Sequence, residues 1–138
     1  MPKGKIAFKV SNSLSELKTL NQKIDKFAVQ LGISDKCLFE IHLVLEELFT
    51  NITCHGYSDD KKHWVDVSIS CKNNIMTIQI EDDGVPFNPL EFKKPDLKCA
   101  VEDRDIGGLG IHLVKHFIKD CVYERRGNKN ILILKKTV

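Results

Sequence analysis

Apolar residues recur along the chain with two different periods, which predict where strands and helices lie. Residues 5–10 alternate between apolar and polar side chains, as expected of a strand with one buried face. Residues 14–31 carry apolar side chains at every third or fourth position, which predicts an amphipathic helix that Gly32 ends. The capping-box pattern of Ser13 and Glu16 marks the start of this helix.

A second helix and a hairpin follow in the sequence. Ser34 or Asp35 can cap the helix, whose apolar stripe ends near Gly56. Residues 65–80 then alternate in two runs separated by Asn73-Asn74, a pair typical of tight turns. The two runs predict an antiparallel hairpin with one buried face.

The periodic pattern lapses between Gly84 and Asp105, where three prolines and many charges occur. A long segment without regular structure inside a domain is often functional, so we predict a mobile lid at residues 88–106. A third amphipathic helix follows Gly110, and a closing hairpin is predicted within residues 122–134.

This order of elements fits neither alternating βαβ units nor an all-β barrel. We therefore predict an α/β (α+β) two-layer sandwich, in which three helices cover one face of a mostly antiparallel, mixed sheet. A chain of 138 residues fits one domain, so residues 1–138 are expected to form a single unit.

Composition narrows the possible functions. The chain has 21 basic and 19 acidic residues, interspersed, so nucleic acid is not expected as a direct partner. Five cysteines without a Cys-x-x-Cys pair indicate neither a disulfide framework nor a zinc site and favour the cytoplasm. No apolar run is long enough to span a bilayer, so no membrane partner is expected. Trp64 and the phenylalanines are expected in the core.

Glu47 and Asn51 are four residues apart in the second helix and therefore share a face at the edge of its apolar stripe. The carboxylate could accept a proton from a hydroxyl or water, and the amide oxygen could be a ligand of Mg²⁺. Glu47 could equally be an ordinary solvated helix residue, with Asn51 preparing the helix end. Taken alone, that second interpretation is the commoner one.

Asp82 ends the alternating run that contains Ile78 and Ile80, so it should project toward the buried face while Asp83 projects outward. A buried carboxylate requires hydrogen-bond donors, and the exocyclic amino group of adenine is a suitable one. The alternative for both residues is a turn aspartate before Gly84, which we prefer for Asp83.

The cluster Gly107-Gly108-Leu109-Gly110 directly precedes the third helix. It lacks the spacing and the lysine of the common P-loop, and no Rossmann fingerprint is present. The free N–H groups at the start of that helix could hold phosphate oxygens.

The motifs Glu47-x-x-x-Asn51, Asp82-x-Gly84-x-Pro86 and Gly108-x-Gly110, in this order, resemble those of the gyrase/histidine-kinase-like (GHKL) ATP-binding superfamily. The resemblance spans nearly the whole chain and implies a Bergerat-type ATP-binding fold. Within that superfamily, the small size and the strings 51–57, 86–89 and 107–111 most resemble the anti-sigma-factor serine kinases.

The resemblance implies a role for each matching position. Glu47 is the expected catalytic base, Asn51 the expected Mg²⁺ ligand and nucleotide contact, and Asp82 the residue that reads adenine. The other expected ATP contacts are Gly84, Pro86, Arg104, Gly107, Gly108, Leu109 and Gly110. Pro86 departs from the family pattern, because many members have glycine there.

The resemblance also implies an activity: an ATP- and Mg²⁺-dependent protein serine/threonine kinase that phosphorylates a small anti-sigma-antagonist protein. A sigma factor or other regulator would be a second partner, and a homodimer the assembly. The alternative is a nucleotide-gated module that sequesters a regulator without phosphorylating it. Glu47 favours catalysis, although both functions need the same pocket. An ATPase fragment of a larger machine is disfavoured because no second domain is expected. A complete sensor histidine kinase is disfavoured because no histidine-bearing dimerisation helix precedes the motifs.

Overall fold

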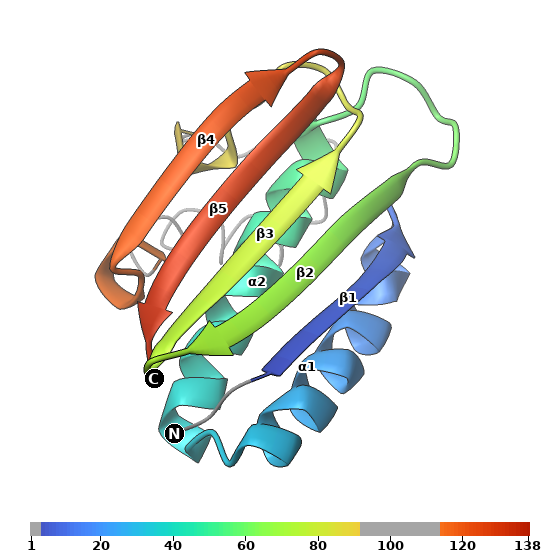
Figure 1. Ribbon diagram of the computed structural model, residues 1–138. Helices are drawn as coiled ribbons and strands as arrows, with labels where there is room; N and C mark the ends of the chain where they lie inside the picture. Colours follow the sequence, from blue (N-terminus) through green and yellow to red (C-terminus); the bar gives the residue numbers. More distant parts are fainter. Residues whose placement is uncertain (1–3, 92–113) are drawn as a thin grey trace.

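The computed structural model describes residues 4–91 and 114–138, which form a two-layer α/β fold (Figure 1). Five strands make one sheet of order β1-β2-β3-β5-β4, in which every neighbouring pair is antiparallel. The strands are β1 (Gly4–Ser11), β2 (Trp64–Lys72), β3 (Ile75–Asp82), β4 (Asp120–Arg126) and β5 (Lys129–Thr137). The predicted two-layer fold is confirmed, and in the described part of the chain the sheet is antiparallel rather than mixed.

Two long helices, α1 (Leu17–Leu31) and α2 (Asp35–His55), pack on one face of the sheet and lie behind the strands in Figure 1. Helix α1 begins later than its apolar stripe because Leu14–Glu16 forms a single 3-10 turn, η1. Ser34, one of the two candidate caps, accepts a backbone hydrogen bond from the first turn of α2. Residues 114–117 are also helical, and the preceding part of the predicted third helix lies outside the described residues.

A two-residue turn between β2 and β3 sets the register of their pairing and so places Asp82 on the buried face of the sheet. Asn73 and Asn74 have φ angles of 55° and 64°, both left-handed, as a type I′ hairpin turn requires. The resulting pairing continues along β3, so that Asp82 lies opposite Asn130 of β5. A shift of one residue would turn Asp82 away from the helices, which explains why this turn matters for the site.

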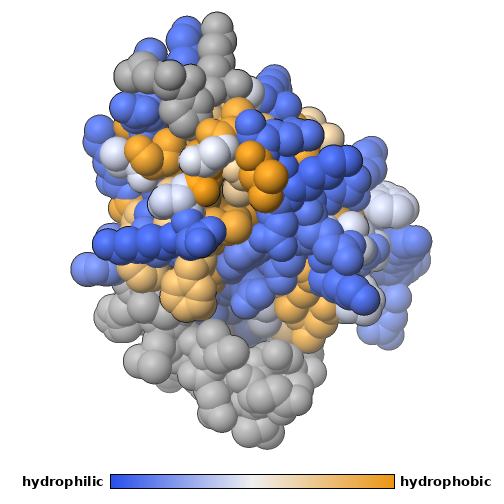
Figure 2. All heavy atoms as spheres, turned by 90° about the horizontal axis from the view of Figure 1, so that it is seen from below, coloured by the Kyte–Doolittle hydropathy of each residue, from blue (hydrophilic) through white to orange (hydrophobic). Residues whose placement is uncertain are grey.

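The core prediction is wrong for two aromatic residues. Trp64 is 47% exposed and Phe39 is 63% exposed. Strand alternation directs Val65 inward and therefore Trp64 outward, where its ring lies 4.7 Å from Lys62 Nζ. Phe39 lies off the apolar stripe of α2. Figure 2 shows hydrophilic residues over most of the described surface in that view, with hydrophobic residues in smaller groups between them.

Three further observations concern the described residues only. None of their helices is long and apolar enough to cross a membrane. No group of three or more His, Cys, Asp or Glu side chains among them could hold a metal ion. Cys37, Cys71 and Cys121 are free thiols.

Candidate functional site

Glu47 and Asn51 lie one helical turn apart on α2, and each is only 3% exposed. Nδ2 of Asn51 donates a hydrogen bond to Oε1 of Glu47 over 3.3 Å. Burial raises the pKa of the Glu47 carboxyl, and the bond from Asn51 partly offsets this effect. A raised pKa makes the carboxylate a stronger base. Because the amide nitrogen of Asn51 is engaged with Glu47, its Oδ1 is the atom able to coordinate a cation.

Asp82 is buried at the end of β3, with 4% of its surface exposed, while Asp83 is exposed, as the strand alternation predicted. Oδ1 of Asp82 accepts hydrogen bonds from the Gly84 amide and from Nδ2 of Asn130, each over 2.9 Å. No donor among the described residues contacts Oδ2. Burial raises the pKa of the Asp82 carboxyl, and these two hydrogen bonds act in the opposite direction. Asp82 therefore has one engaged oxygen and one that can accept from a ligand.

The loop after Asp82 folds back onto the C-terminal end of α2. The Val85 amide donates to the carbonyl oxygen of Gly56 over 2.8 Å. A Cβ atom at Gly84 would lie 2.1 Å from that same oxygen, so only glycine permits the approach. Pro86 lines a cavity of about 300 Å³ together with Gly84. The predicted segment 51–57, at the end of α2, thus meets the predicted motif after β3 through Gly56.

The sequence interpretation missed three residues of the last hairpin that complete this network. Asn130 is 4% exposed, and its Oδ1 accepts hydrogen bonds from the Tyr123 hydroxyl and from Arg125 Nη1. The same Nη1 donates to the carbonyl of Gly84 over 2.8 Å. The only signal in the sequence is an amide, Asn130, directly before the apolar run 131–134 of β5. Its importance becomes visible once β5 is known to lie beside β3 and Asp82.

The remaining predicted site residues fall outside the part of the chain that the structure describes. They are Arg104, Gly107, Gly108, Leu109 and Gly110. Of the predicted lid, only the beginning is described, and it contains a short 3-10 turn, η2 (Pro89–Glu91). The phosphate-binding half of the site therefore stays a prediction from the sequence.

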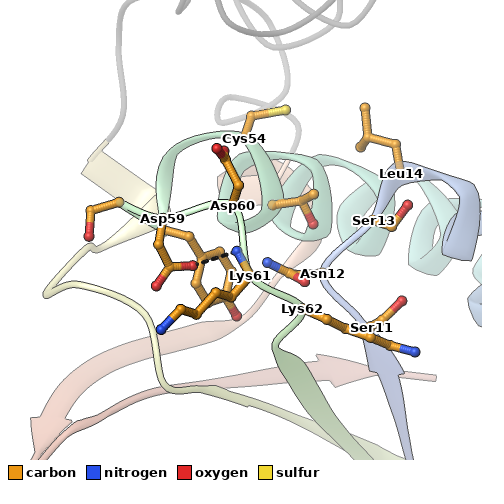
Figure 3. A pocket seen from close by; sticks show the side chains of 12 residues that line it. Ser11, Asn12, Ser13, Leu14, Cys54, Asp59, Asp60, Lys61 and Lys62 are labelled. Atoms are coloured by element: carbon orange, nitrogen blue, oxygen red, sulfur yellow. Dashed lines mark hydrogen bonds between the residues drawn. The ribbon is translucent and has the colours of Figure 1, made fainter.

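A larger cavity of about 650 Å³ adjoins the smaller one and shares Tyr57, Ser58 and Asp59 with it (Figure 3). Its walls come from the end of β1, from η1, and from the end of α2 with the following loop, where the Lys61 amide donates to Asp59. Glu47, Asn51 and Asp82 are not among the residues that line it. We therefore place the candidate site at these three residues and not in the larger cavity.

Comparison with known proteins identifies the family. The model of the histidine kinase-like ATPase domain matches residues 10–136. The chain belongs to this family. Among its relatives is the anti-sigma F factor of Geobacillus stearothermophilus, 26% identical over 110 residues that cover 80% of this chain and 75% of the relative. The serine/threonine-protein kinase BtrW of Bordetella bronchiseptica is 26% identical over 111 residues, 80% of this chain and 78% of that kinase.

A solved structure shows the same fold. The crystal structure of the RsbU and RsbW domains of a Mycobacterium tuberculosis protein has a TM-score of 0.70 and 11% identity, covering 97% of this chain and 32% of that one. The predicted resemblance to the anti-sigma-factor serine kinases of the GHKL superfamily is thus confirmed by the family match and by the names of the relatives.

Proposed function

We propose that the chain is an ATP-dependent protein serine/threonine kinase and anti-sigma-type regulator that phosphorylates a small antagonist protein. The observation that carries the proposal is the meeting of two motif segments. The buried Glu47–Asn51 pair and the buried Asp82 carboxylate are linked through the contact between Gly56 and Val85. Relatives named as an anti-sigma factor and as a serine/threonine kinase support this function.

ATP would bind with its adenine against the end of β3. Oδ2 of Asp82 would accept a hydrogen bond from the adenine amino group, and Gly84 would let the backbone approach the base. Asn51 would supply one oxygen ligand to Mg²⁺, with phosphate oxygens and water supplying the others, and the ion would offset phosphate charge. Arg104 and residues 107–110 are proposed for the phosphates from the sequence alone.

Glu47 would act as the base in phosphoryl transfer. The hydroxyl oxygen of the protein substrate forms a bond to the γ-phosphorus, and the bond from that phosphorus to the β,γ-bridging oxygen breaks. The hydroxyl proton passes to the Glu47 carboxylate, and ADP leaves. The raised pKa of Glu47 suits this role, because a carboxylate with a higher pKa holds the proton more readily.

Substitution of Glu47 tests the proposal. Glu47→Gln keeps an oxygen that can accept the Asn51 bond, so ATP binding measured by calorimetry should change less than about threefold. Transfer of labelled γ-phosphate to an antagonist protein should fall by about 10²–10⁴-fold, because the base is lost. Glu46→Gln is the matched control, since Glu46 instead accepts a hydrogen bond from Asn21. A folded Glu47→Gln protein that no longer bound ATP would show that Glu47 serves binding and not transfer.

A second candidate function is a nucleotide-gated module that sequesters a regulator. The burial of Glu47 favours it, because a carboxylate that is 3% exposed in the described structure offers little access to a substrate hydroxyl. Incubation with labelled ATP and a candidate antagonist separates the two functions. Transfer of label supports the kinase, whereas stable capture without label supports the module.

The proposed partners follow from the same relatives. We propose an anti-sigma-antagonist-like protein as the substrate and a sigma factor or other regulator as a second partner, with homodimerisation and a cytoplasmic location. The low net charge of +2 is consistent with protein partners and gives no reason to propose direct contact with nucleic acid.

A further inference from the structure

The protonation state of Asp82 decides which nucleobase it can pair with. A carboxyl group accepts hydrogen bonds when it is ionised and can donate one when it is protonated. Burial favours the protonated form of Asp82. An accepting carboxylate selects a 6-amino purine such as adenine, whereas a donating carboxyl could pair with the 6-oxo group of hypoxanthine or guanine. A residue that keeps Asp82 in its hydrogen-bond-accepting form therefore contributes to the preference for adenine over 6-oxo purines.

The orientation of the Asn130 amide is fixed by its neighbours. Arg125 Nη1 lies 3.1 Å from Oδ1 of Asn130, and an arginine can only donate. On the other side of the amide, the carbonyl oxygen of Val85 lies 2.8 Å from Nδ2 and can only accept. If the amide were flipped, its NH₂ group would face the Arg125 donor and its oxygen would face the Val85 carbonyl oxygen. The NH₂ group must therefore be the side that meets Asp82.

This orientation determines what Asp82 presents to a ligand. Oδ1 receives two donors, the Asn130 amide nitrogen and the Gly84 backbone amide, both at 2.9 Å. Two donors on one oxygen favour the ionised form, since a carboxylate accepts more strongly than a neutral acid. Oδ2 is then left as an acceptor.

We propose that Asn130, oriented by Arg125 and the Val85 carbonyl, is a positioning residue that holds Asp82 as a hydrogen-bond acceptor and so sets a preference for 6-amino over 6-oxo purine nucleotides. The inference rests on the proposed function, because it requires the base to lie against Asp82. Asn130 itself acts through Asp82. Arg125 acts one step further away, and it also holds the Gly84 carbonyl at 2.8 Å.

The test compares ATP with inosine triphosphate, which carries a carbonyl where ATP carries the amino group. Calorimetry gives the ratio of the two Kd values, and this ratio separates positioning from a general loss of structure, which would weaken both nucleotides equally. Asn130→Asp has nearly the same shape but replaces the NH₂ donor with a second carboxyl oxygen beside Asp82, so that the pair shares a proton. The donors Arg125 and Tyr123 favour the ionised form of the new carboxylate, so the shared proton should reside mainly on Asp82. The preference for ATP should fall about tenfold or more.

Two further variants keep the test decisive if Asn130→Asp does not fold. Arg125→Met and Tyr123→Phe each remove a donor to Oδ1 of Asn130 and leave both hydrogen-bond donors of Asp82 in place, so each should lower the ATP preference by about three- to tenfold. Arg126→Met is the matched control: Arg126 is the next arginine in β4, is exposed, and pairs with Glu124. It should leave the ratio unchanged.

The possible outcomes separate this inference from the proposed function. If the parent protein prefers ATP and the folded variants keep the parent ratio, Asn130 is only structural and the inference is wrong, while nucleotide binding stands. A parent that binds both nucleotides equally also refutes it. A parent that binds neither nucleotide removes the proposed function and this inference together.

Discussion

Gly84→Ala tests the contact that joins the Asp82 strand to helix α2. The added Cβ would lie 2.1 Å from the carbonyl oxygen of Gly56 and 3.0 Å from Oδ1 of Asp82, and Cβ contacts under 3.0 Å essentially never occur. The obstacle at Gly56 is backbone at a helix end, so it cannot rotate away as a flexible side chain would. The loop and the helix end must therefore separate by roughly 1 Å.

The expected cost follows from what the separation breaks. Loss of the 2.8 Å bond from the Val85 amide to Gly56 costs about 0.5–1.5 kcal/mol. Overpacking of a rigid contact adds about 1–3 kcal/mol. The free energy of unfolding should thus fall by about 2–4 kcal/mol, and for a chain of this length the melting temperature should fall by roughly 6–15 °C.

Urea denaturation measures this free energy directly, and Gly127→Ala is the matched control. Gly127 also lies in a turn, at a φ of 62°, but an added Cβ would meet nothing within 4 Å. That variant should lose only the strain of a left-handed alanine, about 1–2 kcal/mol. If Gly84→Ala were as stable as Gly127→Ala, the contact at Gly56 would not be rigid, and the argument that only glycine fits there would fail.

Two ionic clusters that do not include Glu47, Asn51 or Asp82 give further predictions. His63 lies 2.8 Å from Asp59 and 3.1 Å from Asp83, and the pKa of its imidazole is raised, chiefly by the bond to Asp59. The stability it contributes is complete below the unfolded pKa of 6.5 and is lost as the pH rises through the higher folded value. His63→Gln should remove this part of the pH dependence in urea titrations between about pH 6 and 8; a profile identical to that of the parent would contradict it. The buried Lys136 donates to the partly buried Glu40 over 2.7 Å, so Lys136→Met should cost about 1.5–3 kcal/mol of unfolding free energy. Adding Glu40→Leu should restore most of it, because no unpaired charge then remains. A double variant no more stable than Lys136→Met would show that the two charges are not coupled.

Local sequence patterns determined where the helices and strands lie and which face several site residues occupy. Helix and strand periods located the elements, and the Asn73-Asn74 pair and Gly32 marked two of their ends. The same periods placed Glu47 beside Asn51 on one helical face and turned Asp82 inward, because these relations depend only on residues within a few positions of one another.

Only the tertiary structure decided what surrounds those residues. Asn130 meets Asp82 from 48 positions away, because β5 lies beside β3, and strand order is not written in any local pattern. Arg125 reaches the site only through that same arrangement. The exposure of Trp64 is a different case, because it follows from the local alternation that directs Val65 inward; the prediction of a buried tryptophan relied on hydrophobicity and did not apply that alternation.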